Sequence, residues 1–318
     1  MALSLAESAK LSTTELQRGV VETFVQESSI LDRIPLLPIE GNSYAYNEES
    51  TLPGVAFRSV NESYAESTGT VNQKSESLVI LGGDADVDRF IVQTRGNLND
   101  QRAVQTRMKV KAAAFKFQDT FFNGDTASDP KSFDGLRKRL IGTQVISAGT
   151  NGAPIVGAGA ADSHLFFDLL DNLVASVPGL TSSNGALYAN RQVIARIKSA
   201  ARRIGGYEMV REALTGKWVP TYNGIPLLDP GQNAAGADIL PQTETQGTAT
   251  DASSIYAVRF GQTEDDRAVT GLTNGGVMVD DLGQLETKPA YRTRIEFYCG
   301  LAVFGGKAAA RLNGVLAK

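Results

Sequence analysis

Residues 99–125, NDQRAVQTRMKVKAAAFKFQDTFFNGD, carry the clearest helical pattern in the chain. They predict a helix over 99–122, about 35 Å long. At about 100° per residue, the apolar side chains fall into two sectors about 120° apart. A helix of this kind packs on two sides, and the NGD turn ends it, with Gly124 suited to a left-handed exit. The first sector holds Val104, Met108, Ala112, Phe115 and Phe122, and the second holds Val110, Ala114, Phe117 and Phe121.

A third, basic stripe lies between the two apolar sectors and consists of Arg102, Lys109 and Lys116, which are spaced by sevens. We expect this stripe to face water. A more specific interpretation is weak contact with nucleic-acid phosphates, independent of base sequence. No row of aromatic residues accompanies the stripe, so the sequence does not support recognition of particular bases.

The chain before this helix has two parts of different character. Residues 1–35 read as an arm with one short helix, capped by Ser12 and Glu15 and followed by Leu16, Val20 and Phe24 at helical spacing. With no second helix beside it, this helix must dock on its own domain or on a neighbour. Residues 36–90 read as a polar, two-stranded excursion, which is not expected to be stable alone.

The chain after residue 125 mixes helices and strands. Helices are expected over 163–177 and 190–204, the second capped by Asn190. A tight hairpin is expected at Asn223-Gly224. Residues 291–304 alternate in polarity and predict a strand with one apolar face, and 232–253 read as a long surface loop.

Composition excludes several classes of protein. The 318 residues include 31 Lys and Arg against 35 Asp and Glu, a net charge of −4, so no overall positive field marks a nucleic-acid reader. One cysteine and one histidine exclude an internal disulfide, a multi-cysteine metal site and any mechanism that needs two histidines. No run approaches a membrane span. Glu7 and Lys10 interrupt the N-terminal region where a signal peptide would be apolar.

Partial chemical motifs do not assemble into a site. The run from Gly157 to Gly159 lacks the third glycine of a dinucleotide-binding turn, which is replaced by Asp162. His164 is expected on a helix surface, and Cys299 is expected to be a buried, inert thiol. The acidic runs 264–266 and 280–281 read as turn residues rather than cation ligands. We therefore predict no catalytic residue, cofactor site or metal site, and a protein that is not an enzyme.

The order of these parts resembles the major capsid proteins of tailed bacteriophages, those with the Hong Kong 97-like fold. The resemblance covers nearly the whole chain. It rests on DTFFNGD at 119–125 with Gly135-Leu136 after it, NGIPLL at 223–228, SIYAVRFG at 254–261 and YRTRIEFYCGLAV at 291–303.

This resemblance implies an α+β capsid fold with five parts. It also implies that the long helix is a spine helix on the inner side of a shell, with Arg102, Lys109 and Lys116 facing the lumen. The parts are an N-terminal arm (1–35), an extended two-stranded loop (36–90), a peripheral domain with the spine helix (91–154), an axial domain (155–285) and a return strand of the peripheral domain (286–318).

The implied function is a structural one. The chain is expected to form pentamers and hexamers that close into an icosahedral head around double-stranded DNA, assembled in the cytoplasm of a bacterial host and carried in the virion. Expected partners are separate scaffolding and portal proteins and a possible decoration protein, with no membrane. Some relatives carry a long N-terminal scaffolding extension; here only the short arm precedes the extended loop, so scaffolding is expected to be either a separate protein or unnecessary. Lys74 is the only lysine in 36–90, and no partner motif for a covalent cross-link accompanies it.

Two alternatives remain open at this point. An encapsulin-type nanocompartment shares the fold but encloses an enzyme cargo; the long polar loop and the basic helix favour a virus. A small α/β enzyme would need a convergent polar site that the sequence does not provide.

Overall fold

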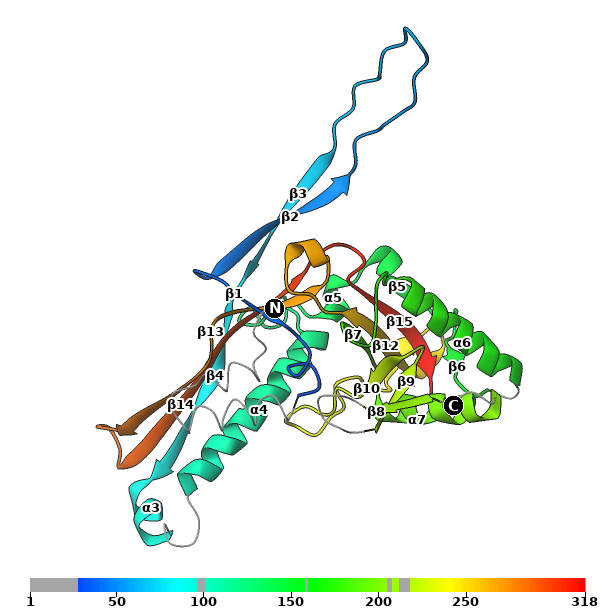
Figure 1. Ribbon diagram of the computed structural model, residues 1–318. Helices are drawn as coiled ribbons and strands as arrows, with labels where there is room; N and C mark the ends of the chain where they lie inside the picture. Colours follow the sequence, from blue (N-terminus) through cyan, green and yellow to red (C-terminus); the bar gives the residue numbers. More distant parts are fainter. Residues whose placement is uncertain (1–27, 96–100, 158–159, 205–207, 212–217, 318) are drawn as a thin grey trace.

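In the computed structural model (Figure 1), the described residues are 28–95, 101–157, 160–204, 208–211 and 218–317. The helices are α3 (Arg89–Arg95), α4 (Gln101–Asn123), α5 (Leu136–Arg139), α6 (Ala160–Ala175) and α7 (Arg191–Ile204), with 3-10 turns η1 (Gly142–Gln144) and η2 (Glu264–Asp266). The strands are β1 (Leu36–Pro38), β2 (Ser43–Thr51), β3 (Thr70–Ser77), β4 (Val79–Asp88), β5 (Val145–Ser147), β6 (Ala153–Pro154), β7 (Gly185–Tyr188), β8 (Glu208–Arg211), β9 (Trp218–Tyr222), β10 (Ile225–Leu228), β11 (Glu244–Gln246), β12 (Ala249–Arg259), β13 (Val269–Gln284), β14 (Ala290–Val303) and β15 (Ala309–Leu316).

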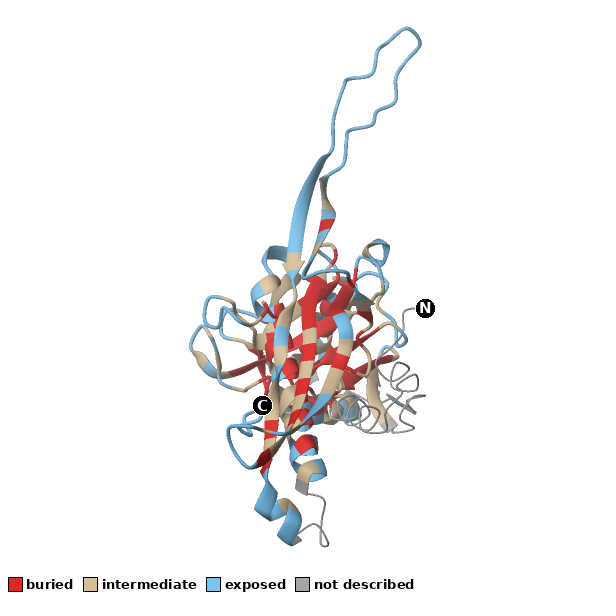
Figure 2. Ribbon diagram, turned by 90° about the vertical axis from the view of Figure 1, so that its left-hand side faces the viewer, coloured by how far each residue is buried: buried red, intermediate tan, exposed pale blue. Residues whose placement is uncertain are grey.

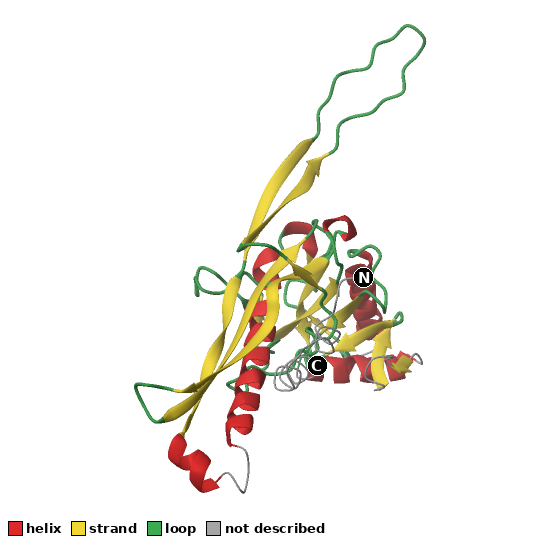
Figure 3. Cartoon of the chain, turned by 60° about the vertical axis from the view of Figure 1, so that its left-hand side comes forward, coloured by secondary structure: helices red, strands yellow, loops and turns green. Residues whose placement is uncertain are grey.

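A four-stranded sheet, ordered β1-β13-β14-β4, carries α4 along one face (Figure 3). Side chains on a strand alternate between the two faces, so Ile295 and Phe297 of β14 are buried on the helix side. The Phe297 ring lies 5.9 Å from that of Phe117 on α4. The alternation predicted for 291–304 therefore holds.

The opposite face of this sheet carries a ladder of ion pairs between β4 and β14. Arg292 binds Asp86 through two hydrogen bonds, from Nε to Oδ1 at 2.7 Å and from Nη2 to Oδ2 at 2.8 Å. Arg294 binds Asp84 in the same way, at 2.8 and 3.1 Å. The hydrogen bonds from Arg292 and Lys288 hold the pKa of Asp86 below its usual range, and Arg294 does the same for Asp84. Opposite charges paired across two strands favour this register over a shifted one.

A second, nine-stranded sheet is buried on both faces. Its main path is β5-β15-β12-β7-β10-β9-β8, with β11 beside β12 and β6 beside β15. Leu187 of β7 and Ile255 and Ala257 of β12 pack under α6 and α7. Tyr188 and Tyr256, one residue along each strand, belong instead to the core that contains α4. Neighbouring strands with apolar residues on both faces make this sheet a middle layer.

Phe122, near the end of α4, packs this helix on the nine-stranded sheet. Its ring lies 5.5 Å from that of Tyr188 and 5.1 Å from that of Tyr256, both in the nine-stranded sheet. It is adjacent to Phe121, 5.0 Å away in an edge-to-face arrangement. Aromatic pairs of this geometry add about 0.5–1.5 kcal/mol each beyond the area they bury. With Phe117 packed on one sheet and Phe122 on the other, α4 is thus the shared core element of both sheets.

Most of the local sequence predictions hold. The predicted helices correspond to α4, α6 and α7, and the Asn190 side chain caps α7 by accepting a hydrogen bond from the amide of Gln192 at 2.9 Å. Asn223 and Gly224 form the expected tight turn between β9 and β10, with φ of 51° and 75°.

Two predictions are corrected, and a third falls on residues that are not described. Gly124 is not left-handed; glycine is required because a Cβ there would lie 2.3 Å from the carbonyl oxygen of Phe133. The surface loop predicted over 232–253 instead includes β11 and the start of β12, and Ile239 and Leu240 are buried. The helix predicted within the arm lies outside the described residues, whereas 28–35 dock on the core of their own chain.

That docking uses apolar side chains and a local cap. Ile30, Leu31 and Ile34 are at most 1% exposed and join the core around α4. The Ser28 hydroxyl accepts hydrogen bonds from the amides of Ile30 and Leu31, at 3.3 and 3.1 Å, which holds the turn. The described part of the arm predicted as 1–35, residues 28–35, therefore packs on the core of its own chain.

The sheet pairings also shift the predicted segment boundaries. β1 and β4, placed within the loop 36–90, are strands of the four-stranded sheet. β13, placed within 155–285, pairs along its length with β14 of that same sheet. β15, placed in the return segment 286–318, belongs to the nine-stranded sheet. Backbone hydrogen bonding between distant segments, which local patterns do not reveal, sets these divisions.

We expect Phe122→Ala to lower the free energy of unfolding by about 3–5 kcal/mol, because it opens a cavity between α4 and the nine-stranded sheet. Met108→Ala on the exposed side of the same helix is the control and should change it by less than about 0.5 kcal/mol. Urea unfolding of the unassembled subunit, followed by circular dichroism, measures both. Equal losses in the two variants would contradict the core role of Phe122.

The ion-pair ladder predicts acid sensitivity. Because the folded-state pKa values of Asp84 and Asp86 lie below their unfolded values, the pairs stabilise the fold above about pH 4 and lose this effect as the pH falls through the folded values. Asp84→Asn/Asp86→Asn should be less stable than the wild type at pH 6 and should lose less stability between pH 6 and pH 3. Thermal unfolding across that range measures this, and parallel losses in both proteins would refute it.

Candidate assembly surfaces

The hairpin β2–β3 projects from the body of the molecule and ends in a long loop over 52–69 (Figure 1). Its strands pair only with each other. The loop exposes large apolar side chains: Val55 and Phe57 are fully accessible and Val60 is 89% exposed, with Leu52 and Tyr64 also exposed. Exposed apolar residues gathered on one projecting segment mark an interaction surface.

Local contacts shape the base of this loop. The Thr51 and Thr70 hydroxyls lie 2.6 Å apart, and the Ser67 hydroxyl donates to the carbonyl oxygen of Gly54 at 2.8 Å. Gly69 is needed at the crossing point, because a Cβ there would meet the Thr51 carbonyl oxygen at 2.9 Å. These contacts hold the two sides together without burying the apolar tip.

The root of the hairpin is clamped to the body at two points. Arg139 of α5 binds Glu76 of β3 in a fork, with Nη1–Oε1 at 2.5 Å and Nη2–Oε2 at 2.7 Å, and both side chains are largely buried. The Tyr44 hydroxyl donates to Glu264 at 2.7 Å. Burial and this hydrogen bond raise the Tyr44 pKa to about 12. A two-point attachment fixes the direction in which the hairpin leaves the body.

Tyr46 adds an apolar contact at the root. Its ring packs edge-to-face on that of Phe304, with centroids 4.9 Å apart, in a small core that includes Ile39 and Leu272. The hairpin therefore has a buried base and an exposed tip, which is the exposure pattern visible in Figure 2.

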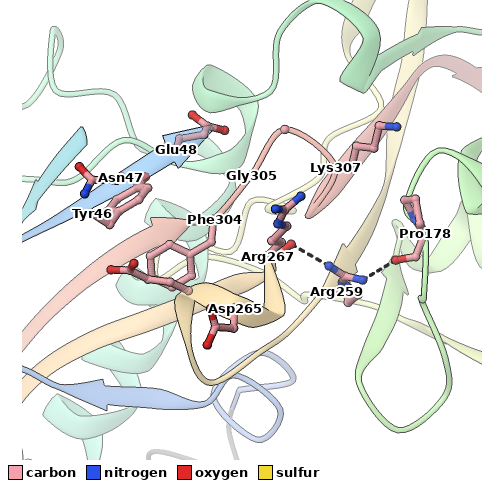
Figure 4. Close-up of a pocket in the computed structure, with 12 residues that line it drawn as sticks. Tyr46, Asn47, Glu48, Pro178, Arg259, Asp265, Arg267, Phe304, Gly305 and Lys307 are labelled. Atoms are coloured by element: carbon pink, nitrogen blue, oxygen red, sulfur yellow. Dashed lines mark hydrogen bonds between the residues drawn. The ribbon is translucent and has the colours of Figure 1, made fainter. Parts of the chain in front are cut away.

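A cavity of about 710 Å³ lies beside this root (Figure 4). Arg259 closes one side: its Nη1 donates to the Pro178 carbonyl at 2.5 Å and its Nη2 to the carbonyls of Asp266 and Arg267 at 2.6 and 2.8 Å. The residues that line the cavity include both cations and carboxylates, so the cavity favours no single class of ion. The lining comprises Tyr46, Asn47, Glu48, Pro178, Arg259, Glu264, Asp265, Arg267, Phe304, Gly305, Gly306 and Lys307.

The structure separates the members of the predicted basic stripe. Arg102 turns toward the four-stranded sheet, where its Nη2 lies 2.6 Å from Asp281 Oδ1 and its guanidinium lies 5.2 Å from the Tyr291 ring centre. Lys109 is half-buried, with its stem over Gly83 of β4. Lys116 is exposed. The prediction that all three face water is wrong for Arg102 and Lys109, since the helix turns that edge toward the sheet.

Sequence reasoning missed the exposed cations of α4. Arg107 and Lys111, one turn apart, are exposed on the side away from the four-stranded sheet, as are Val104 and Met108. Among the described residues, the first apolar sector is therefore only partly covered. The helical projection placed Val104 and Met108 correctly on one face, but it could not tell which of two apolar faces the chain itself covers.

The residues rejected as chemical sites are accounted for. His164 is exposed on α6. Cys299 is buried, which raises its pKa to about 12. Asp266 caps its own turn by accepting hydrogen bonds from the amides of Gln262 and Thr263. Asp281 accepts from the amide of Gly283 and pairs with Arg102.

Within the described part of the chain, no three histidine, cysteine, aspartate or glutamate side chains come close enough together to hold a metal ion. No helix among the described residues has the length and apolar character to cross a membrane.

Comparisons with known proteins agree with this architecture. The model of the family described as "Major capsid protein GP7" matches residues 13–166. No curated protein matches the chain in sequence. Among solved structures, the SrpI encapsulin of Synechococcus elongatus PCC 7942 aligns over 100% of this chain and 98% of its own, at 19% identity and a TM-score of 0.67.

Capsid structures align comparably. The alignment with the capsid of a native GTA particle covers 91% of this chain and 90% of the GTA capsid chain, at 14% identity and a TM-score of 0.64. The alignment with a structure from Mycobacterium phage Bobi covers 90% of this chain and 89% of the phage chain, at 14% identity and a TM-score of 0.58. At these identities the likeness concerns the fold.

Proposed function

We propose that this chain, which has the Hong Kong 97-like fold of tailed-phage major capsid proteins, is the structural subunit of an icosahedral head, assembled through pentamers and hexamers around double-stranded DNA. The observation that carries the proposal is the apolar tip of the β2–β3 hairpin, exposed at the end of a clamped stalk. A side chain of this kind gains about 1.5–3 kcal/mol on full burial. The tip is too far from its own body to gain this, so a neighbouring copy supplies the covering surface.

The parts of the fold then take assembly roles. The four-stranded sheet with α4 is the peripheral domain, and the nine-stranded sheet with α6 and α7 is the axial domain around the five-fold and six-fold axes. The hairpin is the extended loop that lies across a neighbour, and residues 1–27 form the arm. Supporting this division, each sheet has its own covering helices, and α4 joins them.

We also propose that the exposed end of α4 faces the lumen of the shell. There its positive charge would offset the negative charge of DNA phosphates without recognising the base sequence. Of Arg102, Lys109 and Lys116, only Lys116 is exposed enough for this role. Arg102 instead forms an ion pair with Asp281 and stabilises the fold. Each exposed contact is weak and screened by salt, so the effect comes from many copies.

The role is structural rather than catalytic, and it places the protein in the virion after assembly in the host cytoplasm. Separate scaffolding and portal proteins, and a decoration protein where one is used, complete the set of partners. No cofactor enters this function.

An encapsulin-type shell is the second candidate, favoured by the full-length alignment with the SrpI encapsulin. Electron microscopy of purified particles separates the two: DNA-filled heads support the viral role, and small shells that are empty or loaded with protein support the nanocompartment. Isolated globules would refute both and reopen the question of a small α/β enzyme.

We expect Phe57→Ser/Val60→Ser to block closed-shell assembly while leaving the thermal unfolding of the subunit within about 2 °C of wild type, because neither side chain packs on its own chain. Ser59→Ala/Ser63→Ala in the same loop is the matched control and should assemble normally. Sedimentation and electron microscopy measure assembly. Normal shells from the Phe57→Ser/Val60→Ser variant would contradict burial of the tip by a neighbour.

Lys116→Gln should leave subunit unfolding and shell assembly unchanged and modestly reduce the heat resistance of filled heads. Arg102→Gln should instead lower the stability of the isolated subunit, because it leaves Asp281 without its ion-pair partner at 2.6 Å. Calorimetry of subunits and of filled heads distinguishes these effects. Loss of assembly in Lys116→Gln would identify Lys116 as an intersubunit contact and overturn its lumenal role.

A further inference from the structure

The two helices that cover one face of the nine-stranded sheet carry opposite charge. α6 contains three aspartates and no lysine or arginine, whereas α7 contains five lysines and arginines and no carboxylate. Both helices turn apolar side chains inward, where Phe166 and Leu170 of α6 and Val193 and Ile197 of α7 are buried in one core. One domain thus presents an acidic and a basic surface.

The acidic surface centres on Asp168 and Asp171, which lie one turn apart on α6 and are exposed. Asp171 accepts hydrogen bonds from the Tyr222 hydroxyl at 2.6 Å and from the Asn223 side-chain amide at 3.3 Å. Both donors are neutral, and burial and the hydrogen bond to Asp171 raise the pKa of Tyr222, so its hydroxyl keeps the proton. We name Asp168 and Asp171 the α6 aspartates; within the described residues, no cation pairs with them.

The basic surface centres on Arg196 and Arg203, exposed residues two turns or about 10 Å apart on one side of α7. Arg202 is exposed beside them. In the part of the chain that the structure describes, neither Arg196 nor Arg203 forms an ion pair. Like charges on neighbouring turns destabilise a helix, so a run of cations without an intervening carboxylate favours a partner outside α7. We name Arg196 and Arg203 the α7 arginines.

The two surfaces lie toward opposite ends of the molecule. In Figures 1 and 3, α7 lies below the nine-stranded sheet, whereas the β2–β3 hairpin projects upward from the body. The second half of α6, which holds the α6 aspartates, leads toward the hairpin, because Pro178, shortly after the helix ends, lines the cavity at the hairpin root together with Tyr46. A neighbour reached by the hairpin therefore lies beyond this end. In a ring of identically oriented copies, that neighbour turns its α7 end back toward α6.

We propose that, within a ring of subunits, the α6 aspartates of one copy bind the α7 arginines of the next. Arginine suits this contact because its planar fork donates two parallel hydrogen bonds to a carboxylate. Each copy offers one surface of each sign, so the contact is head-to-tail and closes a ring rather than a two-fold dimer. The inference rests on the proposed function, because that function supplies the rings.

DNA is the other occupant that a basic helix face attracts. Phosphates would match α7 alone and would leave the acidic surface of the neighbouring helix without a role. A second copy of the chain uses both surfaces at once. The charge complementarity between α6 and α7 therefore favours a second copy over the genome.

The first test reverses the charge of each surface in the full-length subunit. Asp168→Lys/Asp171→Lys and, separately, Arg196→Glu/Arg203→Glu place like charges on both sides of the contact. We expect each variant to need about tenfold or more protein than the wild type to form five- and six-membered rings. Native mass spectrometry at low ionic strength counts the subunits in each ring, and added salt should weaken the wild-type rings.

Two further variants separate the contact from general effects of charge and folding. Asp129→Lys/Glu286→Lys makes the same charge change at two exposed acidic residues outside α6 and α7 and should form rings as the wild type does. Asp168→Asn/Asp171→Asn removes the charge of the α6 aspartates but keeps an oxygen that accepts the Tyr222 hydrogen bond. It should weaken ring formation less than the lysine variant does, and it replaces that variant if the lysines prevent folding. Thermal unfolding establishes which variants are folded.

Two combinations show whether α6 and α7 meet between copies. A chain that carries all four charge reversals has opposite charges again and should regain ring formation. In an equimolar mixture of the two charge-reversed variants, opposite charges meet only where the variants alternate, so six-membered rings should form and five-membered rings should not. A contact between α7 and any other segment of the chain would not be restored by changing α6.

Several results would overturn the interface. Unchanged ring formation in both charge-reversed variants would refute it and leave the shell function intact, as would failure of both combinations to restore rings. Loss of DNA packaging with normal rings in Arg196→Glu/Arg203→Glu would assign α7 to the genome. Wild-type subunits that form neither rings nor shells would refute the proposed function together with the interface.

Discussion

The burial of one helix between two sheets is the constraint on which this structure depends. Phe117 of α4 packs on Phe297 of the four-stranded sheet, and Phe122 packs on Tyr188 and Tyr256 of the nine-stranded sheet. Because closely packed interiors transmit displacement rather than absorb it, these aromatic contacts fix the position of one sheet relative to the other. The glycine at the end of α4 serves the same purpose, since it lets the returning chain approach the helix at Phe133.

The β2–β3 hairpin differs from α4, because only its root is buried and its tip is exposed. Its root is held by the Arg139–Glu76 fork, the Tyr44–Glu264 hydrogen bond and the Tyr46–Phe304 contact, while the apolar side chains of its tip are exposed. A rigid stalk that presents an apolar tip reduces the ordering cost of association, because the tip is already directed away from the body. A cavity lies beside this stalk, at its root. Arg259 forms one wall of the cavity and donates hydrogen bonds to three backbone carbonyls.

Charge is distributed on α4 according to what each face contacts. The edge turned to the four-stranded sheet uses its cations for the fold: Arg102 pairs with Asp281, and the Lys109 stem crosses Gly83. The far side leaves Arg107, Lys111 and Lys116 exposed. The same residue type therefore contributes to stability on one edge and is exposed on the other.

Sequence alone determined the features that depend on neighbouring residues. The helical period of α4, the Asn190 cap, the Asn223-Gly224 turn and the two-face pattern of β14 follow from local sterics and hydrogen bonding. The order of these parts also sufficed for the resemblance to tailed-phage capsid proteins. The sequence predicted a polar two-stranded excursion that is not stable alone, but it did not predict the exposed apolar side chains of the tip, such as Val55 and Phe57.

The tertiary structure decided everything that depends on pairing between distant segments. It assigned β4 and β13 to the sheet of β14, buried Ile239 and Leu240 in a segment read as a surface loop, and turned Arg102 and Lys109 toward a sheet instead of water. A helical projection shows which side chains share a face, but the covering of that face depends on long-range contacts. For that reason the basic stripe was found in the sequence, whereas the exposed pair Arg107 and Lys111 emerged only from the fold.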